Sequence, residues 1–239
     1  MLHSKSWYIN EYYEKYFDLL CNSGLNKQGS GWSHKNIEKF WVTDQGVNRI
    51  LEVGAGTGTH LNFVKYNLNI DTISYTLLDS RLVTLDKFIN KSQSLEVNSV
   101  VGSVEDLPFQ DESFDRVVST CLFHHLDDPL KAFSEVRRVL RKRGEFTIGM
   151  PTDPGLMNRA VKSLVTFKRA NKLSIPNIKF IYALEHQNHI GGLLEIFKEV
   201  FKNDLIKIRY KPFTVRSWNL NLQVIAHVQK RDSELPEES

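Results

Sequence analysis

The stretch Leu-Glu-Val-Gly-Ala-Gly-Thr-Gly, residues 51–58, carries the strongest structural signal in this chain. It ends a short apolar run, Val47–Val53, which is bounded by glycines and therefore predicts a buried β-strand. Residues 59–66 follow with apolar side chains at helical spacing, so we expect a helix there. Because glycine has no Cβ, the glycines between these elements permit a tight turn and let a ligand approach the backbone closely.

The spacing of the glycines separates two classes of nucleotide-binding protein. A dinucleotide-binding turn has the pattern G-x-G-x-x-G, whereas here Gly58 comes one residue early and Thr59 takes the place of the third glycine. This spacing disfavours a dehydrogenase. The pattern E-x-G-x-G-x-G, which begins at Glu52, resembles the first motif of class I S-adenosylmethionine-dependent methyltransferases. A glycine-rich turn that binds no ligand is the alternative.

An acidic residue stands at the end of the next expected strand, Thr72–Leu78, about twenty residues beyond the glycines. In a doubly wound sheet, a carboxylate at this position can accept hydrogen bonds from both ribose hydroxyls of a cofactor. Asp79 is therefore a candidate ribose ligand. A solvated aspartate in a turn is the alternative.

Three further segments follow in the order typical of one family. Residues 102–119, 122–129 and 139–146 resemble segments of the methyltransferase type 11 family, typified by enzymes of ubiquinone and menaquinone biosynthesis. Together with the glycine motif they cover about residues 47–150. The resemblance implies an α/β fold: a doubly wound, Rossmann-like sheet of seven strands, mostly parallel with an antiparallel last strand. It also implies S-adenosyl-L-methionine as the cofactor.

The same resemblance implies the residues that bind the cofactor. They are Glu52, Gly54, Ala55, Gly56, Gly58, Asp79, Ser80, Ser103, Val104 and Thr120. Glu52 and the glycines would position the methionine end and the ribose, and Thr120 would line the path of the methyl group. The family usually has an aspartate for the adenine amino group where this chain has Ser103. A serine hydroxyl accepts without charge, so the adenine contact at Ser103 and Val104 is expected to be weaker.

Histidines after the fourth strand are the catalytic candidates. His125 and His124 lie where family members carry residues that face the substrate, and histidine is the usual base for a hydroxyl acceptor. A structural role, with each ring bound to the neighbouring loop, is the alternative for both. His186 and His189, in the segment Glu-His-Gln-Asn-His, are two further candidates for the pocket.

No metal site is expected from this loop. Asp127 and Asp128 follow the two histidines closely, and adjacent residues on one loop rarely converge on an ion. Cys121 lacks the neighbours that a cysteine nucleophile needs, and Thr120-Cys121-Leu122 is typical of buried packing.

Composition limits the remaining possibilities. The chain has 239 residues, 41% of them hydrophobic, and a formal charge of +3, which suits one large α/β domain. With two cysteines, no apolar run long enough for a membrane span and no signal peptide, a cytoplasmic location without membrane association is the simplest expectation. We expect a helical cap over residues 1–45 and a cofactor-binding domain over 46–239, with a lid-like insertion at 152–189.

The expected elements are as follows: helices at 4–21, 33–41, 129–141 and 192–201, a loop at 22–32, and strands at 115–119, 145–150, 205–210 and 222–229, the last two as an antiparallel hairpin. The chain from 156 to 189 interrupts the strand–helix alternation. The tail 231–239 is polar and is expected to fray.

The insertion is basic, which bears on the acceptor. Its cations are Arg159, Lys162, Lys168, Arg169, Lys172 and Lys179. A cationic lid favours an anionic small molecule, phosphorylated or nucleotide-linked, although a solvated helix face explains the charges equally well. A loose resemblance to methyltransferases of bacterial polysaccharide and sugar pathways also favours a sugar-linked metabolite. We therefore expect O- or N-methylation of such a molecule.

Two alternatives remain open. A nucleic-acid (RNA) methyltransferase would use the basic insertion to hold phosphates, and a catalytically silent methyltransferase-like scaffold would keep the fold alone.

Overall fold

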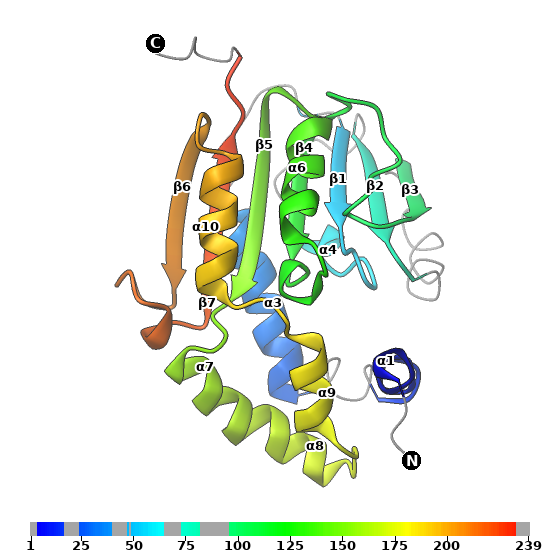
Figure 1. The fold of residues 1–239 in the computed structure, drawn as a ribbon, viewed down its shortest axis with the longest axis vertical. Coiled ribbons are helices and arrows are strands. Elements are labelled where there is room, and N and C mark those ends of the chain that lie inside the picture. Colours follow the sequence, from blue (N-terminus) through cyan, green and yellow to red (C-terminus); the bar gives the residue numbers. More distant parts are fainter. Residues whose placement is uncertain are drawn as a thin grey trace.

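A computed structural model describes residues 4–16, 24–39, 47, 49–64, 73–81 and 96–232. The parts of the expected elements that fall at 17–23, 40–46, 65–72 and 233–239 lie outside these ranges. Figure 1 shows a central sheet with helices on both faces and a further group of helices below the ends of its parallel strands.

The sheet has seven strands in the order β3-β2-β1-β4-β5-β7-β6. They are β1 (Arg49–Val53), β2 (Ser74–Asp79), β3 (Glu96–Val101), β4 (Phe114–Thr120), β5 (Leu140–Pro151), β6 (Leu205–Lys211) and β7 (Gln223–Gln229). Strands β1 to β5 pair in parallel, whereas β7 runs antiparallel to both β5 and β6. The doubly wound α/β fold with an antiparallel last strand is confirmed.

The α-helices are α1 (Lys5–Lys15), α3 (Gly24–Glu38), α4 (Leu61–Val64), α6 (Pro129–Val139), α7 (Leu156–Val161), α8 (Lys168–Lys172), α9 (Ile178–Glu185) and α10 (Ile190–Val200). A π-helical segment, Lys162–Phe167, joins α7 to α8. In the part of the chain that the structure describes, no helix combines the length and the apolar character needed to cross a membrane.

Helices α6 and α10 cover one face of the sheet (Figure 1). Helix α6 begins after Asp128, whose side chain accepts the N–H of Lys131 and so caps the helix. Its apolar residues recur at helical spacing and enter a buried aromatic cluster formed by Phe123, Phe133, Phe146, Phe197 and Phe201. Burying each such ring stabilises the fold by about 1.5–3 kcal/mol, so this layer anchors the loop that follows β4.

The expectation of a loop at 22–32 is wrong from Gly24 onward, where α3 begins. Glycine, serine and asparagine in this stretch disfavour a helix, but intrinsic propensity is weak against tertiary packing. The second half of α3 lies on the opposite face of the sheet, where Ile37 is fully buried with Ile50 and Tyr75. Burial of this face therefore extends the helix beyond the predicted start at Ser33.

A buried polar network joins α3 to the sheet. The Glu38 carboxylate accepts a 2.6 Å hydrogen bond from Arg116 of β4, and its Oε1 also lies 2.9 Å from His60 Nε2. The Nδ1 atoms of His60 and His34 lie 2.9 Å apart. Burial disfavours the charged carboxylate, but Arg116 and His60 outweigh it and lower the pKa of Glu38 to about 2. The pair is therefore ionised inside the protein.

Removing Arg116 tests this network. Arg116→Met leaves the Glu38 charge buried without its main partner, so we expect the free energy of unfolding to fall by about 3–5 kcal/mol in urea denaturation. Arg143→Met is the control, because Arg143 is paired with Asp232 but is 78% exposed, and it should change stability by less than about 1 kcal/mol. Equal losses in the two variants would contradict a structural role for the network.

Candidate functional site

The glycine turn follows β1 at the edge where the parallel strands end. Gly54, Gly56 and Gly58 have φ values of 67°, 53° and 64°, a left-handed conformation that costs other residues about 1–2 kcal/mol. A Cβ on Gly54 would also lie 2.8 Å from Leu122 Cδ2, whereas a Cβ on Gly56 would meet nothing within 4 Å. Glycine is therefore required for packing at 54 and for backbone conformation at 56.

Asp79 lies directly against this turn. Its Oδ2 accepts the N–H of Gly56 at 2.8 Å, and its Oδ1 accepts the N–H of Arg81 at 3.0 Å. Ala55 N donates to Leu78 O at 3.1 Å, and Ser80 is exposed beside the carboxylate. The strand order reverses between β1 and β4, and ligands of open α/β sheets bind at such a point.

Glu52 lies beneath the turn and is 1% exposed. Its Oε2 accepts a hydrogen bond of 2.8 Å from Tyr75 Oη. Burial raises the pKa of Glu52 to about 7, although nearby His60 and the Tyr75 hydroxyl oppose this shift. The structure thus places Glu52 under the turn rather than on its open side, and its contribution to cofactor binding stays a prediction.

The loop after β3 carries the two predicted adenine neighbours. Val104 is buried, whereas Ser103 is exposed and its Oγ accepts the N–H of Glu105 at 3.1 Å. The Glu105 carboxylate in turn accepts the N–H of Asp128 at 2.9 Å. This loop is therefore held against the loop that leads from β4 to α6.

The end of β4 is strained. Thr120 is half-buried, and Cys121 has a φ of 55°, which is unusual for any residue other than glycine. Cys121 N donates to Gly149 O at 2.9 Å, so pairing with β5 continues through the strained residue. Such strain persists where the surrounding structure enforces it, and it often marks a functional site. It turns the chain sharply before the histidines.

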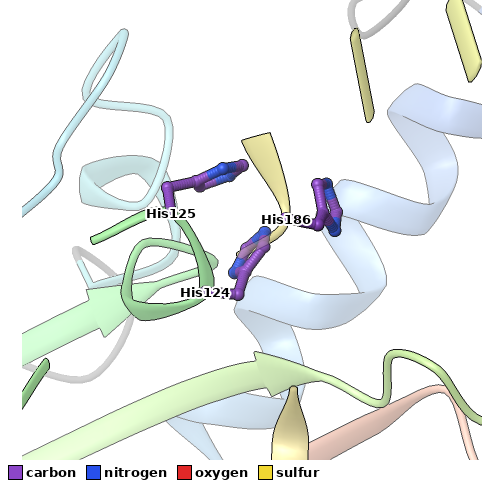
Figure 2. Close-up of side chains that lie close together, drawn as sticks. All are labelled: His124, His125 and His186. Atoms are coloured by element: carbon purple, nitrogen blue, oxygen red, sulfur yellow. The ribbon is translucent and has the colours of Figure 1, made fainter. Parts of the chain in front are cut away.

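His124 and His125 end a short 3-10 helix, Phe123–His125, and meet His186 at the end of α9 (Figure 2). The His124 ring lies 3.8 Å from that of His125 and 4.5 Å from that of His186, measured between centroids. Burial lowers the pKa of His125 to about 4 and that of His124 well below its usual value. Both rings are therefore neutral at pH 7.

The structure brings His186 into this group but not His189, the other histidine proposed for the pocket. His189 is exposed and caps α10, its Nδ1 accepting the N–H of Gly192 at 3.0 Å. His186 Nδ1 lies 2.9 Å from Asp153 Oδ2, and Lys162 also binds that carboxylate. Asp153 was not predicted as part of the site. It lies in a turn rich in proline and glycine, and such a turn does not indicate that its carboxylate contacts a histidine 33 residues later.

Helix α1 covers the two halves of the site. The guanidinium carbon of Arg81, two residues after Asp79, lies 3.7 Å from the centre of the Tyr13 ring. Tyr13 also donates a hydrogen bond to the side chain of Glu185, next to His186. One tyrosine thus contacts both the segment after β2 and the end of α9. The aromatic content of this helix was the only available signal, and it does not indicate which residues the rings contact.

Comparison with known proteins identifies the domain at this site. Residues 51–148 match the family model described as a methyltransferase domain. These residues therefore form a methyltransferase domain. The solved structure of the plantazolicin methyltransferase BpumL, in complex with a monoazolic desmethylPZN analog and SAH, has a TM-score of 0.70 at 14% identity, over 95% of each chain. This likeness supports the fold of the methyltransferase domain.

Relatives of the methyltransferase domain act on different acceptors. The chain is 37% identical over 107 residues to 2-methyl-6-phytyl-1,4-hydroquinone methyltransferase 2 of Oryza sativa subsp. japonica, an alignment over 44% of this chain and 30% of the relative. Glycine/sarcosine/dimethylglycine N-methyltransferase of Actinopolyspora halophila is 28% identical, over 63% and 29%. An uncharacterized protein of Methanocaldococcus jannaschii is 27% identical, over 83% and 88%. The chain spans about a third of the length of the hydroquinone methyltransferases.

Alanine at two positions of the glycine turn tests its packing. Gly56→Ala should lower the free energy of unfolding by about 1–2 kcal/mol, because the new Cβ would contact nothing within 4 Å and the only cost is the left-handed backbone conformation. Gly54→Ala adds a collision with Leu122 and should cost roughly 1–3 kcal/mol more. Urea denaturation of both variants measures the difference. Equal losses would show that Leu122 moves aside freely and that the close packing carries no energy.

The raised pKa of Glu52 predicts a pH-dependent stability. The folded protein holds this proton more tightly than the unfolded chain, so the wild type loses stability as pH rises from about 4.5 to 7. Glu52→Gln keeps an acceptor for Tyr75 without the charge. Its stability relative to the wild type should therefore increase by about 2–3 kcal/mol between pH 5 and pH 8. Glu195→Gln, at an exposed carboxyl on α10, should show no such trend in urea denaturation.

Proposed function

We propose that this chain transfers a methyl group from S-adenosylmethionine to a small-molecule acceptor. The supporting observation is the contact between Asp79 and Gly56 N, which sets the acid at the end of β2 against the glycine turn. A carboxylate has about four lone-pair sites, and two backbone N–H groups occupy two of them. Asp79 therefore retains the capacity to accept both ribose hydroxyls of the cofactor.

The proposed cofactor site follows the edge of the sheet outward from this point. The turn from Gly54 to Gly58, with Ala55, would hold the methionine end and the ribose above Glu52. Ser80 would lie beside the ribose, and Ser103 and Val104 would border the adenine. Thr120, at the end of β4, would face the methyl group. These assignments rest on the family resemblance together with the positions of the residues at one sheet edge.

The proposed reaction is an in-line displacement. A lone pair of the acceptor attacks the methyl carbon, the carbon–sulfur bond breaks with its electrons on sulfur, and the proton of the acceptor passes to a neutral imidazole of the site and then to water. The protein mainly has to align acceptor, methyl carbon and sulfur, with the reacting atoms about 3–3.5 Å apart. We keep His125 and His124 as the acceptor-side catalytic residues. As neutral imidazoles they can accept a hydrogen bond from the acceptor.

For the acceptor we propose an anionic or sugar-linked metabolite, phosphorylated or nucleotide-linked, methylated on oxygen or nitrogen. Arg159, Lys168, Lys172 and Lys179 are exposed on the lid helices, where they can attract an anion. Lys162 contributes less, because Asp153 binds it.

The unpaired thiol of Cys121 agrees with a cytoplasmic location, which we also propose.

Calorimetric titration with S-adenosylmethionine and S-adenosylhomocysteine, with NAD as a control, tests the cofactor. We expect both sulfur compounds to bind and NAD not to bind. Asp79→Ala should weaken the binding of S-adenosylhomocysteine by roughly ten- to a hundredfold, because hydrogen bonds to a carboxylate are lost. Asp111→Ala, at an acid that precedes β4 at the opposite edge of the sheet, should leave the affinity unchanged.

Methyl transfer is measured separately, as release of S-adenosylhomocysteine when phosphorylated and sugar-linked acceptors are added. Cofactor binding without turnover on any acceptor would favour the catalytically silent scaffold. Turnover on RNA that falls steeply with salt would favour the nucleic-acid alternative. Failure of both sulfur compounds to bind would contradict the proposed function.

A further inference from the structure

Three imidazoles from separate parts of the chain meet beside the end of β4. His124 and His125 come from the loop after β4, and His186 comes from the end of the lid helix α9. Figure 2 shows the three rings turned toward a common space. One ring nitrogen from each residue lies within 4.8 Å of the others. This differs from the loop considered from sequence alone, because the third ring arrives from about sixty residues away.

Two of the rings already have an outer hydrogen-bond partner of the kind that metal-binding histidines have. His125 Nδ1 lies 3.2 Å from the carbonyl oxygen of Glu185, to which it can donate. His186 Nδ1 lies 2.9 Å from the Asp153 carboxylate, to which it can also donate. With these protons on Nδ1, the Nε2 atoms of both rings carry free lone pairs. Histidines that bind metals usually have such an outer partner, which fixes the tautomer and the ring orientation.

The third ring supplies an independent observation. His124 is 4% exposed, and its Nδ1 is buried with no hydrogen-bond partner within the described ranges. A buried polar atom without a partner costs about 1–3 kcal/mol, so the folded protein has a free-energy incentive to bind a ligand there. No backbone or side-chain group in the described part of the chain forms a hydrogen bond with this nitrogen.

The charges around the cluster permit a cation. Burial lowers the pKa of all three histidines, so each ring is in the neutral form that binds metal ions. Two cations act on the cluster among the described residues: Arg81, whose charge acts on both His125 and the Glu185 carboxylate, and Lys162, which lies 3.3 Å from His186 Nδ1 and is bound by Asp153. The adjacent ion pair therefore adds little net charge.

We propose that His124, His125 and His186 bind one divalent transition-metal ion of the Zn²⁺ type. Imidazole nitrogens suit Zn²⁺, Co²⁺ and Ni²⁺, and three histidines with an open fourth position form a known catalytic ligand set. In a tetrahedral site with zinc–nitrogen distances of 2.0–2.1 Å, the nitrogens lie about 3.3 Å apart. The three rings therefore have to approach one another by roughly 1–1.5 Å, which side-chain rotation can provide.

The fourth position of the ion would be open to the acceptor. An acceptor hydroxyl bound there loses its proton to water more readily, and the resulting oxygen attacks the methyl carbon. With the ion bound, the histidines act on the acceptor through it. This catalytic role rests on the proposed function, whereas metal binding does not.

Metal titration of the full chain tests the proposal. Protein stripped with a chelator is titrated with Zn²⁺ in a calorimeter and with Co²⁺ by visible absorption. We expect one ion per chain, with the intense absorption of tetrahedral Co²⁺. His186→Ala and His125→Ala should each weaken Zn²⁺ binding by about a hundredfold or more. His124 is left intact, because its replacement would disturb the buried core.

His189→Asn is the matched control, because it removes an imidazole three residues from His186 and keeps a side-chain acceptor for the α10 cap. It should bind Zn²⁺ as the wild type does. Absence of saturable binding, or equal losses in His186→Ala and His189→Asn, would overturn the proposal. Circular dichroism confirms that each variant is folded. Titration with S-adenosylhomocysteine, with and without Zn²⁺, reports the cofactor site separately, so the metal site and the proposed function can fail independently.

Discussion

The contact between Leu122 and Gly54 sets the distance between the two halves of the site. Leu122 packs so closely on the glycine that an added Cβ would lie 2.8 Å from it. Gly54 begins the turn after β1, and Leu122 leads into the histidines after β4. Since β1 and β4 are parallel neighbours, the two segments leave the same edge of the sheet side by side. Replacing this contact by a looser one would separate the glycine turn from the histidine loop.

Support for this edge comes from the interior of the fold. Glu38 of α3 binds Arg116 of β4 and His60 at the end of the glycine turn. The network therefore ties together a helix, a strand and the turn, all on the face opposite α6 and α10. Because the ionised pair is buried, its members are costly to separate. Helix α3 thus belongs to the body of the domain as much as the sheet does.

Local patterns in the sequence were sufficient to predict the sheet and the position of the glycine turn beside Asp79. Apolar runs identified the strands, and the glycine spacing with Asp79 identified the turn, because those residues are close in sequence or are placed by the strand order. The start of α3 and the partner of His186 could not be found in this way. Both depend on contacts between distant segments, such as Ile37 with the sheet and His186 with Asp153, which no local pattern encodes.

The two halves of the site therefore differ in how they are built. The turn, Asp79 and the end of β4 are held by strand pairing, so they form whenever the sheet forms. The histidine group is complete only when α9 brings His186 to the end of β4, and α9 is itself packed against α1 through the cluster of Tyr12, Ile178 and Ile181. Changes in α9 can thus alter the histidine group without disturbing the sheet.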